Sequence, residues 1–131
     1  TERDLIENFM PGPLSMLLRI KNDSSIRGSL VGLNNKINCR VSSHPFVVKL
    51  FEFLDVPIIS TSANISGKEN IFSFKTIYNT FHDLVDIIVD NGDINKSLGS
   101  TIIEIDCDNL KVLREGDIKE KDIMVFLHGR N

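Results

Sequence analysis

The residues best suited to bind a polar ligand lie in the stretch Ser60–Gly67, which reads STSANISG. It places four hydroxyl side chains, one amide and a glycine directly after the apolar pair Ile58-Ile59. In an open α/β sheet, the loop after the carboxyl end of a strand commonly binds ligands, because backbone N–H groups converge there. Hydroxyl and amide donors, with a glycine that permits close approach, suit phosphate oxygens. The same composition is also typical of an ordinary turn that caps its own backbone, and composition alone leaves both interpretations open.

Two arginines could add fixed positive charge. Arg40 stands between Cys39 and Val41 in a run where apolar residues alternate, so we expect its side chain to point away from the buried face. Arg114 closes a second predicted strand. A guanidinium suits a carboxylate or a phosphate, and the competing interpretation for both residues is a solvated surface charge.

The elements that must position these residues follow from hydrophobic periodicity and from turn residues. Strands are expected at Leu14–Ile20, Ile37–Val41, from Ile58-Ile59, and at Asp86–Val89, Thr101–Ile105 and Leu110–Leu113. Helices are expected at Thr1–Met10, Ser43–Leu54, Ser73–Leu84 and Lys119–Leu127. Strands alternating with helices predict an α/β domain with a twisted, mixed sheet and flanking helices.

Composition limits the function classes. With 131 residues, 41% of them hydrophobic, the chain is expected to form one domain, residues 1–131. A net charge of −3 offers no overall attraction for nucleic acid, so an RNA contact would require a local basic patch. Cys39 and Cys107 lack metal-site spacing and are expected to be reduced thiols. No apolar run is long enough to cross a bilayer, so we expect no membrane partner and a cytoplasmic location. Thr1 already lies within a helical pattern, which predicts a piece of something longer.

Five short motifs occur in order along the chain. They are Pro11-Gly12-Pro13-Leu14-Ser15, Cys39–Pro45, Ser60–Gly67, Gly99–Ile103 and Leu113–Gly116. This succession resembles the YrdC-like threonylcarbamoyl-adenylate synthase family, which carries P-G-P-x-T, R-x-P/x-x-H-P, T/P-S-A-N-x-S-G, S-T-V-V and L-R-x-G in that order. The resemblance runs from Glu7 to Ile118 and implies a YrdC-like fold. The family's amino-terminal part, with its Lys-x-Arg pair, has no counterpart here, so the chain is expected to be the carboxyl-terminal part of such a domain.

The resemblance implies an enzyme, a nucleotidyltransferase that forms threonylcarbamoyl-AMP from L-threonine, bicarbonate and ATP with release of pyrophosphate. The product is used in tRNA threonylcarbamoyladenosine modification, so tRNA and downstream threonylcarbamoyl-transfer enzymes are implied partners. ATP as substrate and Mg²⁺ as cofactor are also implied, although no carboxylate is assigned to the metal. Without the Lys-x-Arg pair, weak or no turnover is expected from these residues alone.

Site residues follow from the resemblance, motif by motif. Threonine-binding positions are Arg40, Ser60 and Ser100. ATP-binding positions are Lys36, Ser62, Asn64, Asn70 and Arg114. No catalytic acid or base is identified.

Two other functions stay open at this point. One is a YrdC-like carbamoyl-transfer domain of the hydrogenase-maturation type, which would use carbamoyl phosphate and ignore threonine. The other is a non-catalytic module that binds double-stranded RNA by shape, against which the net charge counts.

Overall fold

The computed structural model describes residues 2–24, 26, 31–106 and 109–129. The chain divides into two compact units. The first combines Thr1–Asp55 with Leu98–Asn131, and we call it the sheet unit. The second is Val56–Ser97, which we call the α3 unit after its helix.

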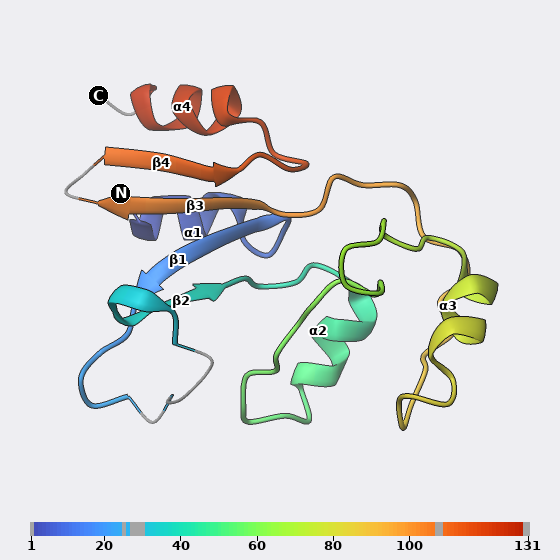
Figure 1. Ribbon diagram of the computed structural model, residues 1–131. Coiled ribbons are helices and arrows are strands. Elements are labelled where there is room, and N and C mark those ends of the chain that lie inside the picture. Colours follow the sequence, from blue (N-terminus) through green and yellow to red (C-terminus); the bar gives the residue numbers. More distant parts are fainter. Residues whose placement is uncertain (1, 25, 27–30, 107–108, 130–131) are drawn as a thin grey trace. The chain divides into compact units, whose positions relative to one another are not determined.

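The sheet unit is built on a mixed four-stranded sheet with the strand order β2-β1-β3-β4 (Figure 1). The strands are β1 (Leu14–Arg19), β2 (Lys36–Cys39), β3 (Thr101–Asp106) and β4 (Asn109–Arg114). β1 runs parallel to β3, whereas the β1–β2 and β3–β4 pairs are antiparallel. A short 3₁₀ turn, η2 (Leu33–Asn35), leads into β2. The predicted fold class, a mixed sheet with flanking helices, is confirmed.

One face of this sheet carries the core. Side chains alternate along a strand, and Leu14, Met16 and Ile103 share a face on which each is at most 1% exposed. Leu5 of α1 (Glu2–Phe9) and Ile123 of α4 (Glu120–His128) complete the buried cluster. Both helices therefore pack on that face, and they tie the first and last parts of the sheet unit together.

Two further helices match their predicted positions. α2 (Pro45–Phe51) begins with proline in its first turn and has His44 at its N-cap, as the Ser-His-Pro pattern predicts. α3 (Phe74–Phe81) starts after Ser73, and the carboxylate of Asp93 accepts a hydrogen bond from the Phe74 N–H at 2.8 Å. A negative group at the start of a helix satisfies a free N–H and favours the helix dipole.

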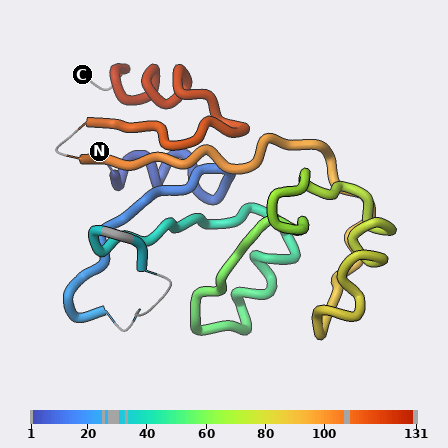
Figure 2. Tube along the Cα trace, in the orientation of Figure 1, coloured from blue at the N-terminus to red at the C-terminus, as the bar shows by residue number. Residues whose placement is uncertain are grey.

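The strands predicted at Ile58-Ile59 and Asp86–Val89 are wrong: neither segment enters the sheet, and Figure 1 draws no arrow for either. Figure 2 traces the chain through both segments. An extended segment becomes a strand only when a neighbour supplies its ladder of hydrogen bonds. No described residue of the α3 unit pairs with them in this way, and Ile59 and Ile87 are 76% and 80% exposed. The loop Ser60–Gly67 therefore does not follow a sheet strand, contrary to the sequence interpretation.

Other expectations can be placed more briefly. β2 ends at Cys39 rather than Val41, and Val41 is 51% exposed. The Cys39 thiol is free, and burial raises its pKa; Cys107 lies outside the described residues. Among the helices of the described residues, none has the length and apolar character required to cross a membrane.

Candidate functional site

Four strand ends of the sheet unit lie at the same end of its sheet. β1 and β3 begin there because they are parallel, and β2 and β4 end there because each is antiparallel to its neighbour. Arg40 follows the last residue of β2, and Arg114 is the last residue of β4. Ser100 comes directly before β3. The directions of the strands thus place three of the predicted site residues, Arg40, Ser100 and Arg114, at the same end of the sheet.

Ser100 is the point at which the two arginines meet. Arg40 Nη1 donates a hydrogen bond to Ser100 Oγ at 2.6 Å. Arg114 donates to the Ser100 carbonyl oxygen through Nη2 at 2.6 Å and through Nε at 3.2 Å. Ser100 itself is 6% exposed, whereas both arginines are exposed. One buried serine therefore holds two fixed positive charges in neighbouring positions at the surface.

Two guanidinium groups so close together repel each other, and an anion between or beside them would offset that repulsion. Each of them also keeps donors beyond those used on Ser100, because a guanidinium has five N–H groups. Ser100 Oγ accepts from Arg40, and among the described residues its own proton has no acceptor. The arrangement is suited to a carboxylate or phosphate with an adjacent hydrogen-bond acceptor.

Hydrogen bonds connect four of the five sequence motifs at this end of the sheet. Gly12 N–H donates to Val41 O at 2.9 Å, which joins the first motif to the second. Thr101 N–H donates to Pro13 O at 2.9 Å, which joins the fourth motif to the first. The fifth motif meets the fourth through Gly116 N–H, which donates to Thr101 Oγ1 at 2.9 Å. These four motifs are distant in sequence but form one hydrogen-bonded assembly.

Lys36 is placed away from this assembly. It begins β2, whereas Arg40 follows the end of that strand, and its Nζ forms an ion pair with Glu104 of β3. The two side chains are only 12% and 16% exposed. The structure therefore does not bring Lys36 to Ser100, and its charge is already compensated. No sequence pattern marks Glu104 as its partner, because the pairing depends on strand order.

The remaining predicted residues belong to the α3 unit. Asn64 shapes its own loop: its side-chain amide donates to Ile65 O at 3.1 Å and to Lys68 O at 2.8 Å. Gly67 has a φ of 77°, a left-handed conformation that favours glycine. Ser60, Ser62 and Asn70 are exposed. The self-capping turn considered for this sequence is thus present, and it leaves the serine hydroxyls at the surface.

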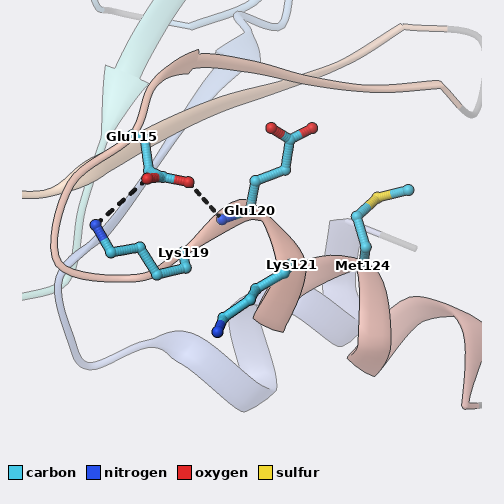
Figure 3. Close-up of a pocket in the computed structure, with 5 residues that line it drawn as sticks. All are labelled: Glu115, Lys119, Glu120, Lys121 and Met124. Carbon is cyan, nitrogen blue, oxygen red and sulfur yellow. Dashed lines mark hydrogen bonds and ion pairs between the residues drawn. The ribbon is translucent and has the colours of Figure 1, made fainter.

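A surface pocket lies elsewhere in the sheet unit, where β4 turns into α4 (Figure 3). It is lined by Glu115, Lys119, Glu120, Lys121 and Met124. Glu115 accepts hydrogen bonds from the Glu120 N–H at 3.0 Å and from Lys119 Nζ at 3.3 Å. The Glu120 N–H, and then Lys119, hold the pKa of Glu115 below its usual value. Glu115 caps the first N–H of α4 and forms an ion pair with Lys119, so we do not assign the ligand site here.

Among the described residues, no group of three or more His, Cys, Asp or Glu side chains could hold a metal ion. Mg²⁺ prefers oxygen ligands in octahedral geometry, and the carboxylate of Glu104 is engaged by Lys36. No described residue is therefore assigned as a ligand of Mg²⁺.

Residues 1–116 match the family Sua5/YciO/YrdC, described as "Telomere recombination". The chain is 31% identical over 119 residues to the threonylcarbamoyl-AMP synthase of Pyrococcus abyssi, covering 91% of this chain and 34% of that protein. It is 29% identical over 121 residues to the threonylcarbamoyl-AMP synthase of Schizosaccharomyces pombe, covering 91% of this chain and 30% of that protein.

A solved structure is similar over nearly the whole chain. The crystal structure of P. abyssi Sua5 complexed with L-threonine superposes with a TM-score of 0.85 at 27% identity, over 96% of this chain and 36% of that one. The chain spans about a third of the length of these relatives. With a family match over most of its residues and the same fold, this chain belongs to the Sua5/YciO/YrdC family.

Proposed function

We propose that this chain provides the arginine-bearing part of a threonylcarbamoyl-AMP synthase, an enzyme that joins L-threonine, bicarbonate and ATP for tRNA threonylcarbamoyladenosine modification in the cytoplasm. The observation that carries the proposal is the convergence of Arg40 and Arg114 on Ser100. Relatives named threonylcarbamoyl-AMP synthase and a neighbour crystallised with L-threonine support the same assignment.

In this proposal, Arg40 binds the carboxylate of threonine. One of its amino groups is fixed by Ser100 Oγ, which orients the guanidinium plane before the ligand arrives. Its other N–H groups can then form charge-assisted hydrogen bonds to a carboxylate, and little side-chain entropy is lost on binding. Ser100 donates its hydroxyl proton to the same ligand. Ser60 is the third threonine-binding residue in the proposal.

Arg114 acts on the nucleotide. Its Nε and Nη2 are held by the Ser100 carbonyl, which leaves Nη1 for a phosphate oxygen. Ser62, Asn64 and Asn70 are proposed as further nucleotide-binding residues. Asn64 acts by shaping the loop, because its side-chain amide is used within it. Lys36 was expected to bind ATP, and in the proposal it does so only after release from Glu104.

The reaction explains why positive charge is needed. The amine of threonine adds to bicarbonate with loss of water, which gives a carbamate. A carbamate oxygen then attacks the α-phosphate, a new P–O bond forms, and the bond to pyrophosphate breaks. Carboxylate, carbamate and triphosphate are all anions, so bringing them together requires fixed cations. No step is assigned to Mg²⁺ bound by these residues.

Binding of L-threonine to the 131-residue chain tests the central assignment. We expect calorimetry or NMR titration to show binding that weakens about tenfold or more in Arg40→Lys and in Ser100→Ala, because the first removes the guanidinium and the second removes the hydroxyl that orients it. Arg19→Lys is the matched control, since Arg19 is an exposed arginine at the other end of β1. Equal affinities in all four proteins would remove Arg40 and Ser100 from the site.

Turnover requires a second experiment. We expect little pyrophosphate release from the chain alone, and threonine-dependent release when the amino-terminal part of the P. abyssi relative is fused ahead of it. Activity with carbamoyl phosphate but not with threonine would favour the hydrogenase-maturation chemistry. A salt-sensitive shift of double-stranded RNA with no nucleotide binding would favour the RNA-binding module.

A further inference from the structure

Thr101 is completely buried, and both functions of its hydroxyl are used. It is 0% exposed, although it is a polar residue at the start of a strand. Its Oγ1 accepts a hydrogen bond from the Gly116 N–H at 2.9 Å and donates one to the Ile118 carbonyl. One hydroxyl thereby joins the beginning of β3 to the turn that follows β4.

Two more hydrogen bonds clamp the same pair of segments on the other side of Ser100. The Asp117 N–H donates to Gly99 O at 2.9 Å, and the Leu98 N–H donates to Asp117 Oδ1 at 2.9 Å. Ser100 lies between Gly99 and Thr101, so its backbone is held from both neighbours.

The backbone of Gly116 also packs closely against the backbones of Gly99 and Ser100. A Cβ atom on Gly116 would stand 2.2 Å from Gly99 O and 2.6 Å from the Ser100 carbonyl carbon. Real Cβ atoms are not found at such distances, so only glycine permits the two backbones to approach this far. This explains why the last motif ends in glycine, although no unusual backbone angle requires it.

These contacts surround the residue that orients both arginines. Ser100 uses its side chain for Arg40 and its carbonyl for Arg114. A rotation of the Ser100 backbone would break both sets of hydrogen bonds at once. We propose that Thr101 is a positioning residue: its buried hydroxyl, with Gly116 and Asp117, fixes Ser100 so that Arg40 and Arg114 are held toward one anionic ligand.

The ligand part of this inference rests on the proposed function, whereas the arginine geometry does not. Two measurements therefore test the arginine geometry and the ligand binding separately. The first is a pair of guanidinium NMR signals, the Nη–H of Arg40 and the Nε–H of Arg114, which report the hydrogen bonds to Ser100 without any ligand. The second is the affinity for L-threonine, measured at a temperature at which every variant is folded.

The central variant is Thr101→Val, which keeps the shape of the side chain and removes its hydroxyl. We expect the two arginine signals to shift, amide exchange at Gly116 and Asp117 to accelerate relative to Ile103, and threonine affinity to fall about tenfold. Thr101→Ser restores the hydroxyl and should return all three quantities toward the unmodified chain. Thr80→Val is the matched control, because Thr80 Oγ1 bonds only to the Thr76 carbonyl within α3.

The inference is overturned if Thr101→Val lowers the melting temperature but leaves the arginine signals and the threonine affinity unchanged, since Thr101 would then be a core residue only. If Thr101→Val does not fold, Asp117→Ala carries the same readouts, because it removes the acceptor of the Leu98 N–H, and no arginine shift in that variant would likewise contradict the inference. If the unmodified chain binds no threonine while the arginine signals respond to Thr101→Val, the proposed function fails for the chain and the positioning role stands.

Discussion

The sheet unit and the α3 unit differ sharply in how they bury apolar side chains. In the sheet unit, Leu5, Leu14, Ile103 and Ile123 are 0% exposed. In the α3 unit, no described residue is buried. Six of its large apolar side chains are half-buried, namely Ile71, Phe72, Phe74, Ile77, Phe81 and Ile88. Ten others are between 47% and 80% exposed: Val56, Ile58, Ile59, Ile65, Tyr78, Leu84, Val85, Ile87, Val89 and Ile94.

This difference separates two ways of building a site. Arg40, Ser100 and Arg114 stand on a sheet whose core supplies the free energy that keeps them in place. The loop Ser60–Gly67 depends on local hydrogen bonds, such as those of Asn64, with little hydrophobic burial behind it. Apolar burial is the main favourable term in folding. Arg40, Ser100 and Arg114 are therefore preorganised, whereas the loop Ser60–Gly67 is not.

Hydrogen exchange tests the comparison most directly and with the largest expected effect. We expect core amides of β1 and β3 to exchange about a thousandfold more slowly than amides of α3, because opening α3 exposes little apolar surface. NMR-detected exchange of the unmodified chain provides both values in one sample. Similar protection in β3 and α3 would show that the α3 unit is stabilised by contacts other than apolar burial.

A matched pair of apolar truncations tests whether the two units differ in how much their apolar side chains contribute to stability. Ile103→Ala removes a fully buried side chain and should lower the free energy of unfolding by about 4 kcal/mol. Ile59→Ala truncates a side chain that is 76% exposed and should change it by about 0.5 kcal/mol or less. Chemical denaturation followed by circular dichroism measures both. A large loss in Ile59→Ala would mean that this isoleucine is covered in solution.

A matched pair of glycine substitutions sharpens the difference in packing. Gly116→Ala places a Cβ atom 2.2 Å from Gly99 O and should cost about 3 kcal/mol, because one backbone must move. Gly67→Ala meets no atom within 4 Å and should cost about 1 kcal/mol, the strain of a φ of 77°. Thermal melting of the two variants decides the order, and a larger loss in Gly67→Ala would contradict it.

The smallest expected effect concerns pH and the start of α4. Because hydrogen bonds from the Glu120 N–H and from Lys119 lower the pKa of Glu115, the ionised carboxylate stabilises the fold above the ordinary pKa of 4.5. That contribution is lost as the pH falls below 4.5 through the lowered folded-state pKa. The melting temperature of the unmodified chain should therefore exceed that of Glu115→Gln slightly at pH 6, and the gap should close toward pH 3. A gap that widens with acid would reverse the assigned sign.

The fold of the sheet unit was largely predictable because its signals are local. The alternation around Met16 and Ile103, and the helical spacing around Leu5 and Ile123, report burial directly. The same reasoning was wrong at Ile58-Ile59 and Asp86–Val89, where apolar residues are present without a neighbouring strand. Periodicity detects the ability to form a strand, whereas a strand also needs a partner.

The candidate site was likewise predictable only in part from the sequence. From its motif positions the sequence marked Arg40, Ser100 and Arg114, and the structure brings them together. It could not show that Lys36 pairs with Glu104, nor that the Thr101 hydroxyl reaches Gly116. Those contacts join β2 to β3 and β3 to the turn after β4, so they depend on strand order and register.

Reading the amino-acid order alone was enough to identify the family resemblance, the helices and four strands of the sheet, and the residues able to bind anions. Folding decides which of those residues meet, because parallel and antiparallel pairing determines which strand ends lie at the same end of the sheet. Two arginines that are 74 positions apart converge on one buried serine only when β2 and β4 end where β3 begins.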